Sequence, residues 1–251
     1  MSQDTPSPAV AHQYLGLPGL NEIVLFWGNY LGVVMDVRGP QFGESKALLG
    51  APKQLLADEV YQRVGASIID GTLPPGHRIR DAELAEKFGV SRMPIREALQ
   101  RLERVGLVEM HPSRYTQVTE VPPQLTEKTL EYAGYLGGAV AAIAVPRLNE
   151  AEREEAAALA RALDDGLGDA ATLTARRWEL LHYLSRHSDN EILDTVLDQT
   201  SMPLSRNLRP WAVDVTERDH MREVHAALAD AILAGDGHAA EHLVRAMHHV
   251  D

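Results

Sequence analysis

The chain has 251 residues, 45% of them hydrophobic and none of them cysteine, so it can form globular cores but no disulfide framework or thiolate site. Its length indicates two domains, and its net charge of −12 at first argues against a nucleic-acid partner. However, residues 51–121 carry ten basic and ten acidic residues, whereas residues 122–251 carry twelve and twenty-two. The acidic excess therefore lies in the C-terminal half, and nucleic-acid binding stays open for residues 51–121.

Residues 1–50 are expected to form a separate N-terminal extension. Their apolar stretch, Ile23 to Met35, is interrupted by Asn29 and has no Lys or Arg before it, so it is a poor signal peptide. The extension either packs on a dimer or reflects a mis-assigned start with Met35 as initiator; we expect a dispensable or poorly ordered segment. No run of apolar residues reaches membrane-spanning length, and the lack of cysteine fits a reducing compartment, so we expect a cytoplasmic protein.

A first helix is predicted from Gln54 to Asp70. One of its faces is apolar, and Gly71 follows its end; the apolar positions are Leu56, Val60, Val64 and Ile68. The next run, Leu73 to Ile79, predicts a proline turn followed by a short extended segment.

Two further helices follow in close succession. Asp81 to Phe88 predicts a short amphipathic helix capped by Asp81, and Gly89 separates it from a longer helix between Ser91 and Gly106. Ser91 suits the N-cap of that helix, and Pro94 falls in its first turn. An apolar stripe is formed by Ile95, Ala98, Leu99, Leu102 and Val105. The opposite side carries Arg92, Met93, Arg96, Gln100 and Arg104, where guanidinium groups can reach phosphates and guanine edges. The pattern is typical of a DNA-binding helix-turn-helix.

A small hairpin is predicted after the third helix. Leu107 to Met110 and Thr116 to Thr119 alternate apolar and polar residues, and Arg114 and Tyr115 fall near the tip between them. Residues 51–121 are therefore predicted to form a winged helix-turn-helix with three helices and a β-wing. Arg101 points to the flank of its helix, which favours a salt bridge or a phosphate contact.

The run DGTLPPGHRIRDAELAEKFGVSRMPIREALQRLERVGLVE resembles the DNA-binding domain of the GntR family of bacterial transcriptional regulators. The rest of the chain resembles, more loosely, the FadR-type branch, whose C-terminal domain is all-helical and binds effectors. The resemblance implies that the third helix enters the major groove and the wing tip touches the minor groove. The DNA-contacting residues it implies are Ser91, Arg92, Met93, Pro94, Arg96, Ser113, Arg114 and Tyr115. Two departures from the family pattern, Ala82 and Tyr115, leave the operator sequence open.

Residues 122–251 are predicted to contain helices only. The first runs near Thr126 to Val145, and a later one from Thr216 to Ala234. Capping boxes are predicted at Asn149 with Glu152 and at Ser188 with Glu191, and Asp236 is predicted to cap the last helix. Six helices make an antiparallel bundle, so the fold class is mainly α: a winged helix-turn-helix followed by an all-α bundle.

The family resemblance also implies a divalent metal, zinc or similar, held by one Asp and three His. His182 and His225 match two of the histidines, and the third falls near Met247, so that His248 would need a one-residue shift. The Asp position is occupied by Trp178, which cannot bind a metal, and Glu179 is the nearest substitute. The alternative is that these histidines are core or pocket residues satisfied by hydrogen bonds.

An effector pocket in the bundle is implied in the same way. Relatives carry a carboxylate-binding arginine in the first bundle helix, but TLEYAGYLGGAVAAIAV contains none. Tyr132 and Tyr135 are the predicted hydroxyl donors, Trp178 is the predicted pocket wall, and the small residues predict close helix packing.

Three functional hypotheses follow. The first is a homodimeric transcriptional regulator, usually a repressor in this family, that binds a short palindrome and responds to a small effector. The second is a DNA-binding dimer whose helical domain binds neither effector nor metal. The third, a metal-dependent hydrolase, has little support because no HExxH, GxSxG or P-loop motif occurs, so we do not expect an enzyme.

Overall fold

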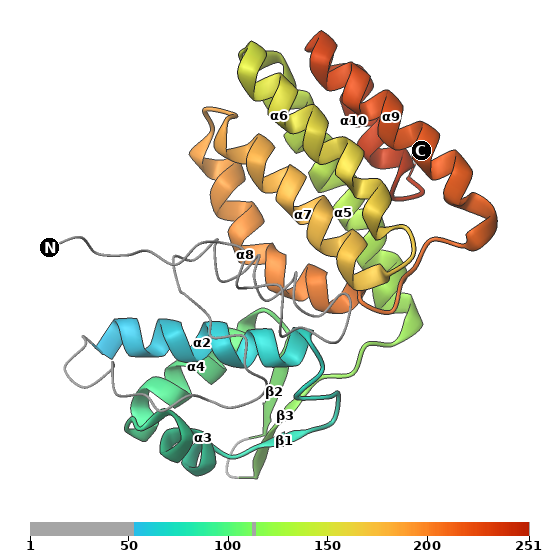
Figure 1. The fold of residues 1–251 in the computed structure, drawn as a ribbon. Helices are drawn as coiled ribbons and strands as arrows, with labels where there is room; N and C mark the ends of the chain where they lie inside the picture. Colours follow the sequence, from blue (N-terminus) through green and yellow to red (C-terminus); the bar gives the residue numbers. More distant parts are fainter. Residues whose placement is uncertain (1–52, 112–113, 251) are drawn as a thin grey trace, which may run out of the picture.

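The computed structural model of the chain describes residues 53–111 and 114–250. The predicted N-terminal extension, residues 1–50, lies outside them, as does Ser113. Figure 1 shows a smaller N-terminal unit of helices and a short sheet beside a larger unit of helices only. The predicted fold class, mainly α with a small β-wing, is confirmed.

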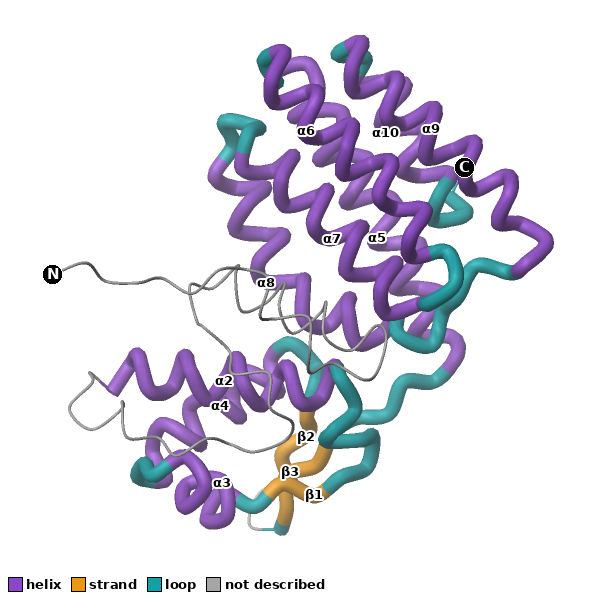
Figure 2. Tube along the Cα trace, in the orientation of Figure 1, coloured by secondary structure: helices purple, strands orange, loops and turns teal. Residues whose placement is uncertain are grey.

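The N-terminal unit contains three helices and three strands. The helices are α2 (Lys53–Ile69), α3 (Asp81–Phe88) and α4 (Arg92–Arg104), and the strands are β1 (Arg78–Ile79), β2 (Val108–His111) and β3 (Tyr115–Val118). The sheet has the order β1-β3-β2 with antiparallel pairs, and Val108 lies opposite Val118. It lies at one edge of the helices (Figure 2). The predicted hairpin is therefore present, each of its strands shifted by one residue.

The core of this unit joins the predicted apolar stripes. Val60, Val64, Ile95 and Leu99 are fully buried where α2 packs on α4. Gly89, with φ of 64°, makes the left-handed turn that separates α3 from α4. Burying one side of α4 in this way leaves its other side on the surface.

The N-caps of two helices differ from the predicted ones. Asp81 is the first residue of α3 rather than its cap, because Arg80 takes the N-cap position and makes no side-chain capping bond. Asn190, not Ser188, caps the helix that begins at Glu191. Ser188 lies in the turn that ends the preceding helix, where its hydroxyl donates to the Ser185 carbonyl.

The helical unit contains the six predicted α-helices within residues 114–250. They are α5 (Pro123–Ala144), α6 (Glu150–Arg161), α7 (Ala170–Arg186), α8 (Glu191–Leu208), α9 (Arg218–Ala234) and α10 (Gly237–Ala246). Short 3-10 turns lie between some of them: η2 (Val145–Arg147), η3 (Ala162–Gly166) and η4 (Val215–Glu217). The capping box of Asn149 with Glu152 and the cap of Asp236 are confirmed.

The glycines of α5 allow close packing against α10. A Cβ atom on Gly134 would lie 2.9 Å from Val250 Cγ2, and one on Gly137 would lie 2.9 Å from Val244 Cγ1. The predicted close approach at the small residues of this helix is therefore present.

Helix α8 connects the two units. Its C-terminal half packs against α2 (Figure 1). The side chain of Met202 is buried and belongs to the core of the N-terminal unit. Arg206 Nη1 donates to the Thr119 carbonyl at 3.2 Å, and Arg209 Nη1 donates to the Ile69 carbonyl at 2.8 Å. Both units therefore contact the same helix.

Candidate functional site

The outer face of α4 carries most of the residues nominated for DNA contact. Arg92, Met93 and Arg96 are exposed, with Met93 at 66%, while Ile95 and Leu99 are fully buried on the opposite side. Farther along the same face lie the exposed residues Gln100 and Arg104. The helix thus holds a row of basic and polar side chains on a rigidly packed support.

The start of α4 departs from the prediction at Pro94. Ser91 is exposed at the N-cap and makes no side-chain capping bond, so it lies on the outer surface. Pro94, by contrast, is buried in the first turn, where its missing N–H costs little. Its ring packs inward, so the structure does not support Pro94 as a contact residue.

Two arginines of α4 are held by acidic residues of different helices. Arg96 Nε donates to Asp81 Oδ2 of α3 at 3.1 Å, and its side chain remains 67% exposed. Arg101 instead pairs with Asp58 of α2, and its guanidinium lies 4.3 Å from the Tyr61 ring centroid. Arg96 is therefore oriented on the outer surface, whereas Arg101 faces α2, as the predicted salt bridge requires.

The wing adds more positive charge beside α4. Arg114 is exposed and Tyr115 is half-buried near the tip. The Tyr115 ring contacts the Arg78 guanidinium of β1, 4.5 Å from its centroid, and the His111 ring at 4.4 Å. Sequence reasoning missed Arg78 and His111, because only the three-stranded sheet brings them to Tyr115.

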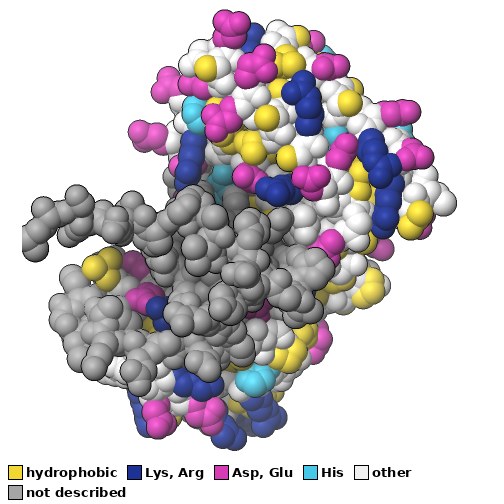
Figure 3. All heavy atoms as spheres, viewed as in Figure 1, with side chains coloured by type: hydrophobic (Ala, Val, Ile, Leu, Met, Phe, Trp, Pro, Cys, Tyr) yellow, Lys and Arg dark blue, Asp and Glu magenta, His cyan; other side chains and the backbone are white. Residues whose placement is uncertain are grey.

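The charged surface of the N-terminal unit is mixed rather than purely basic. Figure 3 shows Lys and Arg side chains beside Asp and Glu side chains at its lower edge. Exposed arginines of α4 and the wing can bind phosphates, and such binding weakens as salt rises. The arrangement suits a contact that depends on shape and a few arginines more than on overall charge.

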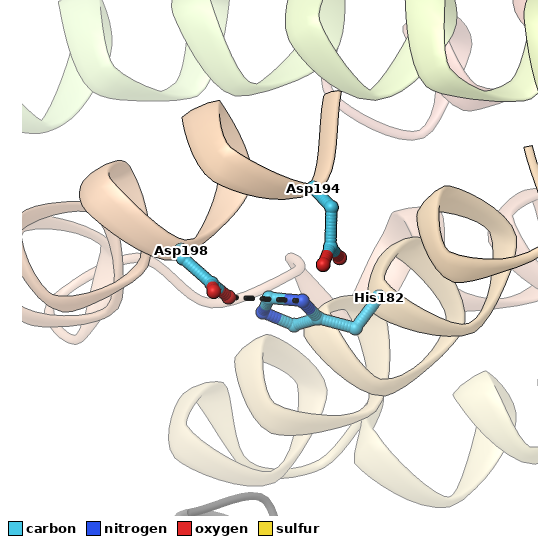
Figure 4. Close-up of side chains that lie close together, drawn as sticks. All are labelled: His182, Asp194 and Asp198. Atoms are coloured by element: carbon cyan, nitrogen blue, oxygen red, sulfur yellow. Dashed lines mark ion pairs between the residues drawn. The ribbon is translucent and has the colours of Figure 1, made fainter. Parts of the chain in front are cut away.

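Several polar groups are buried in the helical unit. His182 of α7 lies near two acidic residues of α8, with its Nδ1 3.8 Å from Asp198 Oδ1 (Figure 4). Asp194 accepts a hydrogen bond from Ser185 at 2.9 Å. Burial lowers the pKa of His182 to about 4, so its ring is neutral at pH 7. Single ligand atoms of His182, Asp194 and Asp198 lie within 4.8 Å of one another, so this group could hold a cation.

A second buried group surrounds Arg177 of α7. His225 Nδ1 bonds Asp164 Oδ1 at 2.7 Å, and His248 Nδ1 bonds the Val244 carbonyl at 2.8 Å. Burial lowers the pKa of both histidines, and the charge of Arg177 lowers both further. Both rings are therefore neutral at pH 7, and the Arg177 guanidinium donates to the carbonyl of Met247, the residue before His248.

Comparison with known proteins connects this geometry to a family. Residues 56–118 match the family described as "Bacterial regulatory proteins, gntR family", and residues 129–249 match the "FCD domain". The chain belongs to the GntR family of bacterial transcriptional regulators.

Individual relatives agree with this assignment. The chain is 33% identical over 108 residues to the uncharacterized HTH-type transcriptional regulator YdhC of Bacillus subtilis. The aligned residues make up 43% of this chain and 46% of that protein. It thus spans less than half of that relative. It is 28% identical over 201 residues to the "Probable D-xylose utilization operon transcriptional repressor" of Paenarthrobacter nicotinovorans, covering 78% of this chain and 85% of that one. The solved structure of E. coli McbR/YncC has the same fold as this chain, with a TM-score of 0.61 and 23% identity. The match covers 77% of this chain and 93% of that one.

Family and relatives are transcriptional regulators, not enzymes, so the hydrolase hypothesis is dropped. Residues 56–118 are thus a GntR-type winged helix-turn-helix domain, and residues 129–249 are an FCD domain. Among the described helices, none has both the length and the apolar character needed to cross a bilayer.

The predicted metal ligands of the GntR chain do not converge. In the part of the chain that the structure describes, the only group of three candidate ligands contains His182 but not His225, His248 or Glu179. Glu179 instead pairs with Arg176 at 3.0 Å. Trp178 is buried, and the charge of Arg177 lowers the pKa of His225 and of His248. The donor set therefore does not fit the metal centre that the family implies.

The predicted effector residues are also separated. Tyr132 and Tyr135 are 46% and 51% exposed on α5, so they do not line the interior, whereas Trp178 is buried with its ring 5.7 Å from the His182 ring. Sequence reasoning missed Arg177, although one signal was present. Leu173, Leu180 and Leu184 are spaced at helical intervals that place Arg177 on the buried side of α7.

Proposed function

We propose that this GntR regulator is a cytoplasmic homodimeric repressor that binds a short palindromic operator and releases it when a small effector binds the helical domain. The observation that carries the proposal is the exposed face of α4, where Arg92, Met93 and Arg96 project from a fully buried support beside the wing. A relative named as a repressor supports the direction of regulation.

A dimer supplies the affinity that one domain lacks. Residues 51–121 have equal numbers of basic and acidic residues, so a single N-terminal unit gains little from general attraction to DNA. Two units joined through the helical domains would contact two half-sites, and the operator would then share the two-fold symmetry of the protein.

Helix α8 is the route by which an effector would act. It packs on α7 inside the helical unit, and its Met202 and Arg206 contact the N-terminal unit, as does Arg209 just after its end. A ligand that favours a different position of α8 would therefore shift the winged domain and change the spacing of the two half-site contacts.

The DNA-binding test compares wild type with Arg96→Ala by fluorescence anisotropy, using DNA that flanks the protein's own gene. Removal of one base-reading arginine should weaken binding by about 1–3 kcal/mol, or roughly 5- to 150-fold in Kd. Arg222→Ala is the control, since Arg222 is an exposed arginine of α9 paired with Asp219. Equal affinities for all three proteins would overturn the role given to α4.

The dimer is tested by hydroxyl-radical footprinting on the same DNA. The proposal expects two protected stretches related by a two-fold axis and separated by about one helical turn. A single unsymmetrical stretch would contradict a dimer on a palindrome.

A regulator without an effector is the second candidate, and the separated Tyr132, Tyr135 and Trp178 favour it. Thermal shift measurements with a panel of metabolites distinguish the two. Stabilisation by a compound that also releases DNA supports the effector, whereas a panel without any hit favours a helical domain that only dimerises.

For a divalent cation, the proposed position is His182, Asp194 and Asp198 rather than the set predicted from sequence. Elemental analysis of purified wild type and Asp198→Asn tests it. One equivalent of metal that the variant loses supports this position, and wild type without metal after incubation with Zn²⁺ or Mn²⁺ refutes it.

A further inference from the structure

One face of α8 meets the N-terminal unit at three places. Met202, Arg206 and Arg209 are spaced by four and three residues, so they follow one side of the helix and of the turn that ends it. Met202 is buried against α2, where a Cβ on Gly65 would lie 2.6 Å from its Sδ. Arg209 Nη1 donates at 2.8 Å to the carbonyl of Ile69, the last residue of α2. Both of these contacts are made to α2.

Arg206 makes the third contact, at the C-terminal end of α4. Its Nη1 donates to the Thr119 hydroxyl and, at 3.2 Å, to the Thr119 carbonyl. The same hydroxyl donates to the Gly106 carbonyl at 2.6 Å, and the Thr119 amide donates to the Leu107 carbonyl at 3.1 Å. Gly106, with φ of 75°, lies in the turn that ends α4. Thr119 therefore joins the Arg206 guanidinium to the end of α4.

The other nitrogens of Arg206 are held within the helical unit. Nε and Nη2 donate to Asn207 Oδ1 at 2.9 and 2.8 Å, and Asn207 Nδ2 donates to Thr129 Oγ1 of α5 at 3.1 Å. The Thr126 hydroxyl, one turn earlier on α5, donates to the Asn207 carbonyl at 3.0 Å. The guanidinium is thus fixed to α5 and α8 on one side and to the N-terminal unit on the other.

Burying an arginine to join two units is costly. Arg206 is 6% exposed, and burial lowers its pKa while the charge of Glu120 raises it. Well-packed apolar residues in place of buried charged groups are often neutral or stabilising, so stability alone does not explain the arginine. Hydrogen bonds depend on direction, whereas the flexible side chain of Met202 adapts to different packing. The arginine network therefore fixes an orientation that apolar contact leaves loose.

The covalent link between the units does not fix that orientation by itself. Residues 119–122 form the segment between β3 and α5. Pro122 and Pro123 restrict φ at its end, but rotation about the bonds of Glu120 and Val121 can still turn one unit against the other. The hydrogen bonds of Arg206 restrain Thr119, the first residue of this segment, and so oppose that rotation.

We propose that Arg206 is a positioning residue for DNA binding, which through Thr119 sets the angle at which the helical unit presents α4. This inference rests on the proposed function, because the angle affects binding only if α4 lies against DNA. In a dimer, the same angle decides how far apart the two copies of α4 lie, and therefore which spacing of half-sites is bound. Arg206 is buried between the units and acts through the position of the exposed face of α4.

Distances between spin labels test the angle without DNA. Because the chain has no cysteine, Glu97→Cys on α4 and Ala227→Cys on α9 give one exposed label on each unit. Labelled full-length chains are mixed with an excess of unlabelled chains of the same variant, so that double electron–electron resonance measures distances within one chain. We expect a narrow distribution in the wild-type background. Arg206→Met and Thr119→Val, which replaces the hydroxyl by a methyl group, should both broaden it.

Half-site spacing tests the consequence for DNA. One base pair is added to or removed from the centre of the operator found by footprinting, and Kd is measured by fluorescence anisotropy. One base pair rotates a half-site by about 35°, so wild type should bind the altered operators about tenfold more weakly. Arg206→Met should bind the original and altered operators within about threefold of each other, because its α4 is no longer held at one angle.

Met221→Ala is the control for lost stability, since it truncates a buried side chain in the core of the helical unit. It should keep the narrow distribution and the spacing preference. Arg206→Lys keeps the charge without the fork that reaches Asn207 and Thr119 together, so it should not restore the narrow distribution. The double variant of Arg206→Met and Thr119→Val should be no broader than Arg206→Met alone, because both changes remove the same bond.

A narrow distribution in both Arg206→Met and Thr119→Val would overturn the inference. Equal broadening in Met221→Ala, or a spacing preference that Arg206→Met retains, would overturn it as well. Failure of the proposed function is seen separately. If Arg206→Met broadens the distribution but wild type binds no DNA, Arg206 still fixes the orientation of α4 and the regulator is refuted.

Discussion

At the scale of residues, Arg96 and Arg101 lie five positions apart on α4 and face different surroundings. Arg96 is 67% exposed with one bond to Asp81, whereas Arg101 is enclosed by Asp58 and the Tyr61 ring. Helical periodicity predicts which arginine faces outward, and the flank position of Arg101 was predicted for this reason. The partners themselves come from α2 and α3, so the sequence of α4 alone does not identify them.

Arg101→Ala is expected to change stability rather than recognition. The variant loses a partly exposed ion pair and a cation–π contact, which together contribute about 1 kcal/mol. Urea denaturation should show this loss, while the Kd for DNA at low temperature stays within about threefold of wild type. A larger loss of affinity than that of Arg96→Ala would show that Arg101 faces DNA instead.

Buried histidines predict how stability varies with pH. The pKa values of His225 and His248 are lowered from 6.5 by burial first. Arg177 lowers both further, the hydrogen bond to Asp164 raises that of His225, and the charges of His249 and His225 lower that of His248. Above pH 6.5 both rings are neutral in the folded and unfolded chain. As pH falls below 6.5 the unfolded chain takes up protons that the folded chain does not, so stability decreases.

Melting temperatures between pH 7.5 and 5 measure this loss in the absence of added anions. Arg177→Gln should show a smaller decrease, because one of the causes that lower both pKa values is removed. A melting temperature that is constant or rises toward pH 5 would contradict the buried, neutral histidines.

At the scale of elements, the ends of helices were predicted correctly only where a single residue nearby could end or cap the helix. The end of α3 at Phe88 was predicted correctly because the amphipathic stretch stops at Gly89, which adopts a positive φ. The start of α8 was misplaced because Ser188 and Asn190 both suit an N-cap, and only the structure shows that the Ser188 hydroxyl bonds the preceding turn. For α5, glycine and alanine occur on all sides, so the sequence does not show that Tyr132 and Tyr135 face outward.

The glycine face of α5 gives a prediction at this scale. Alanine at Gly137 gains about 1 kcal/mol of helix propensity, but its Cβ would lie 2.9 Å from Val244 Cγ1 and 3.3 Å from Leu181 Cδ1. Crowding of two buried side chains costs about 1–3 kcal/mol, so Gly137→Ala should destabilise the protein by about 1 kcal/mol in thermal denaturation.

Gly168→Ala provides the comparison, since its Cβ would meet nothing within 4 Å. That variant should be neutral or slightly more stable than wild type. If Gly137→Ala were also stabilising, the close approach of α5 and α10 would be wrong.

At the scale of the whole molecule, α8 belongs to both units. Its Asp194 and Asp198 lie near His182 in the helical unit, and Met202 is buried in the other core. The family resemblance predicts two domains, but it does not predict that α8 packs against both of them. In the sequence Met202 is an ordinary apolar residue of an amphipathic helix, so nothing marks it as the contact. The buried polar groups were beyond prediction for a similar reason: Asp164 meets His225, and Arg177 meets Met247, only through the packing of distant helices.

Met202→Ala should loosen the contact between the units. Truncation of a buried methionine costs about 2–3 kcal/mol here, and the amides of α2 should exchange faster in hydrogen–deuterium exchange. Met221→Ala, in the core of the helical unit, should lose similar stability without affecting α2 more than the rest of the N-terminal unit. If the amides of α2 exchanged at the same rate in Met202→Ala as in wild type, α8 would not stabilise the DNA-binding unit.

The central claim, that the exposed face of α4 lies against DNA, is tested most directly by affinity cleavage. The chain has no cysteine, so Met93→Cys gives a single attachment point for an iron chelate on that face, and Val215→Cys gives one at a position of the helical unit that is 71% exposed. The account predicts that the chelate at position 93 cleaves bound DNA at two sites related by two-fold symmetry, while the chelate at position 215 does not. Bound DNA left intact by the first protein, or cleaved equally by both, would contradict it.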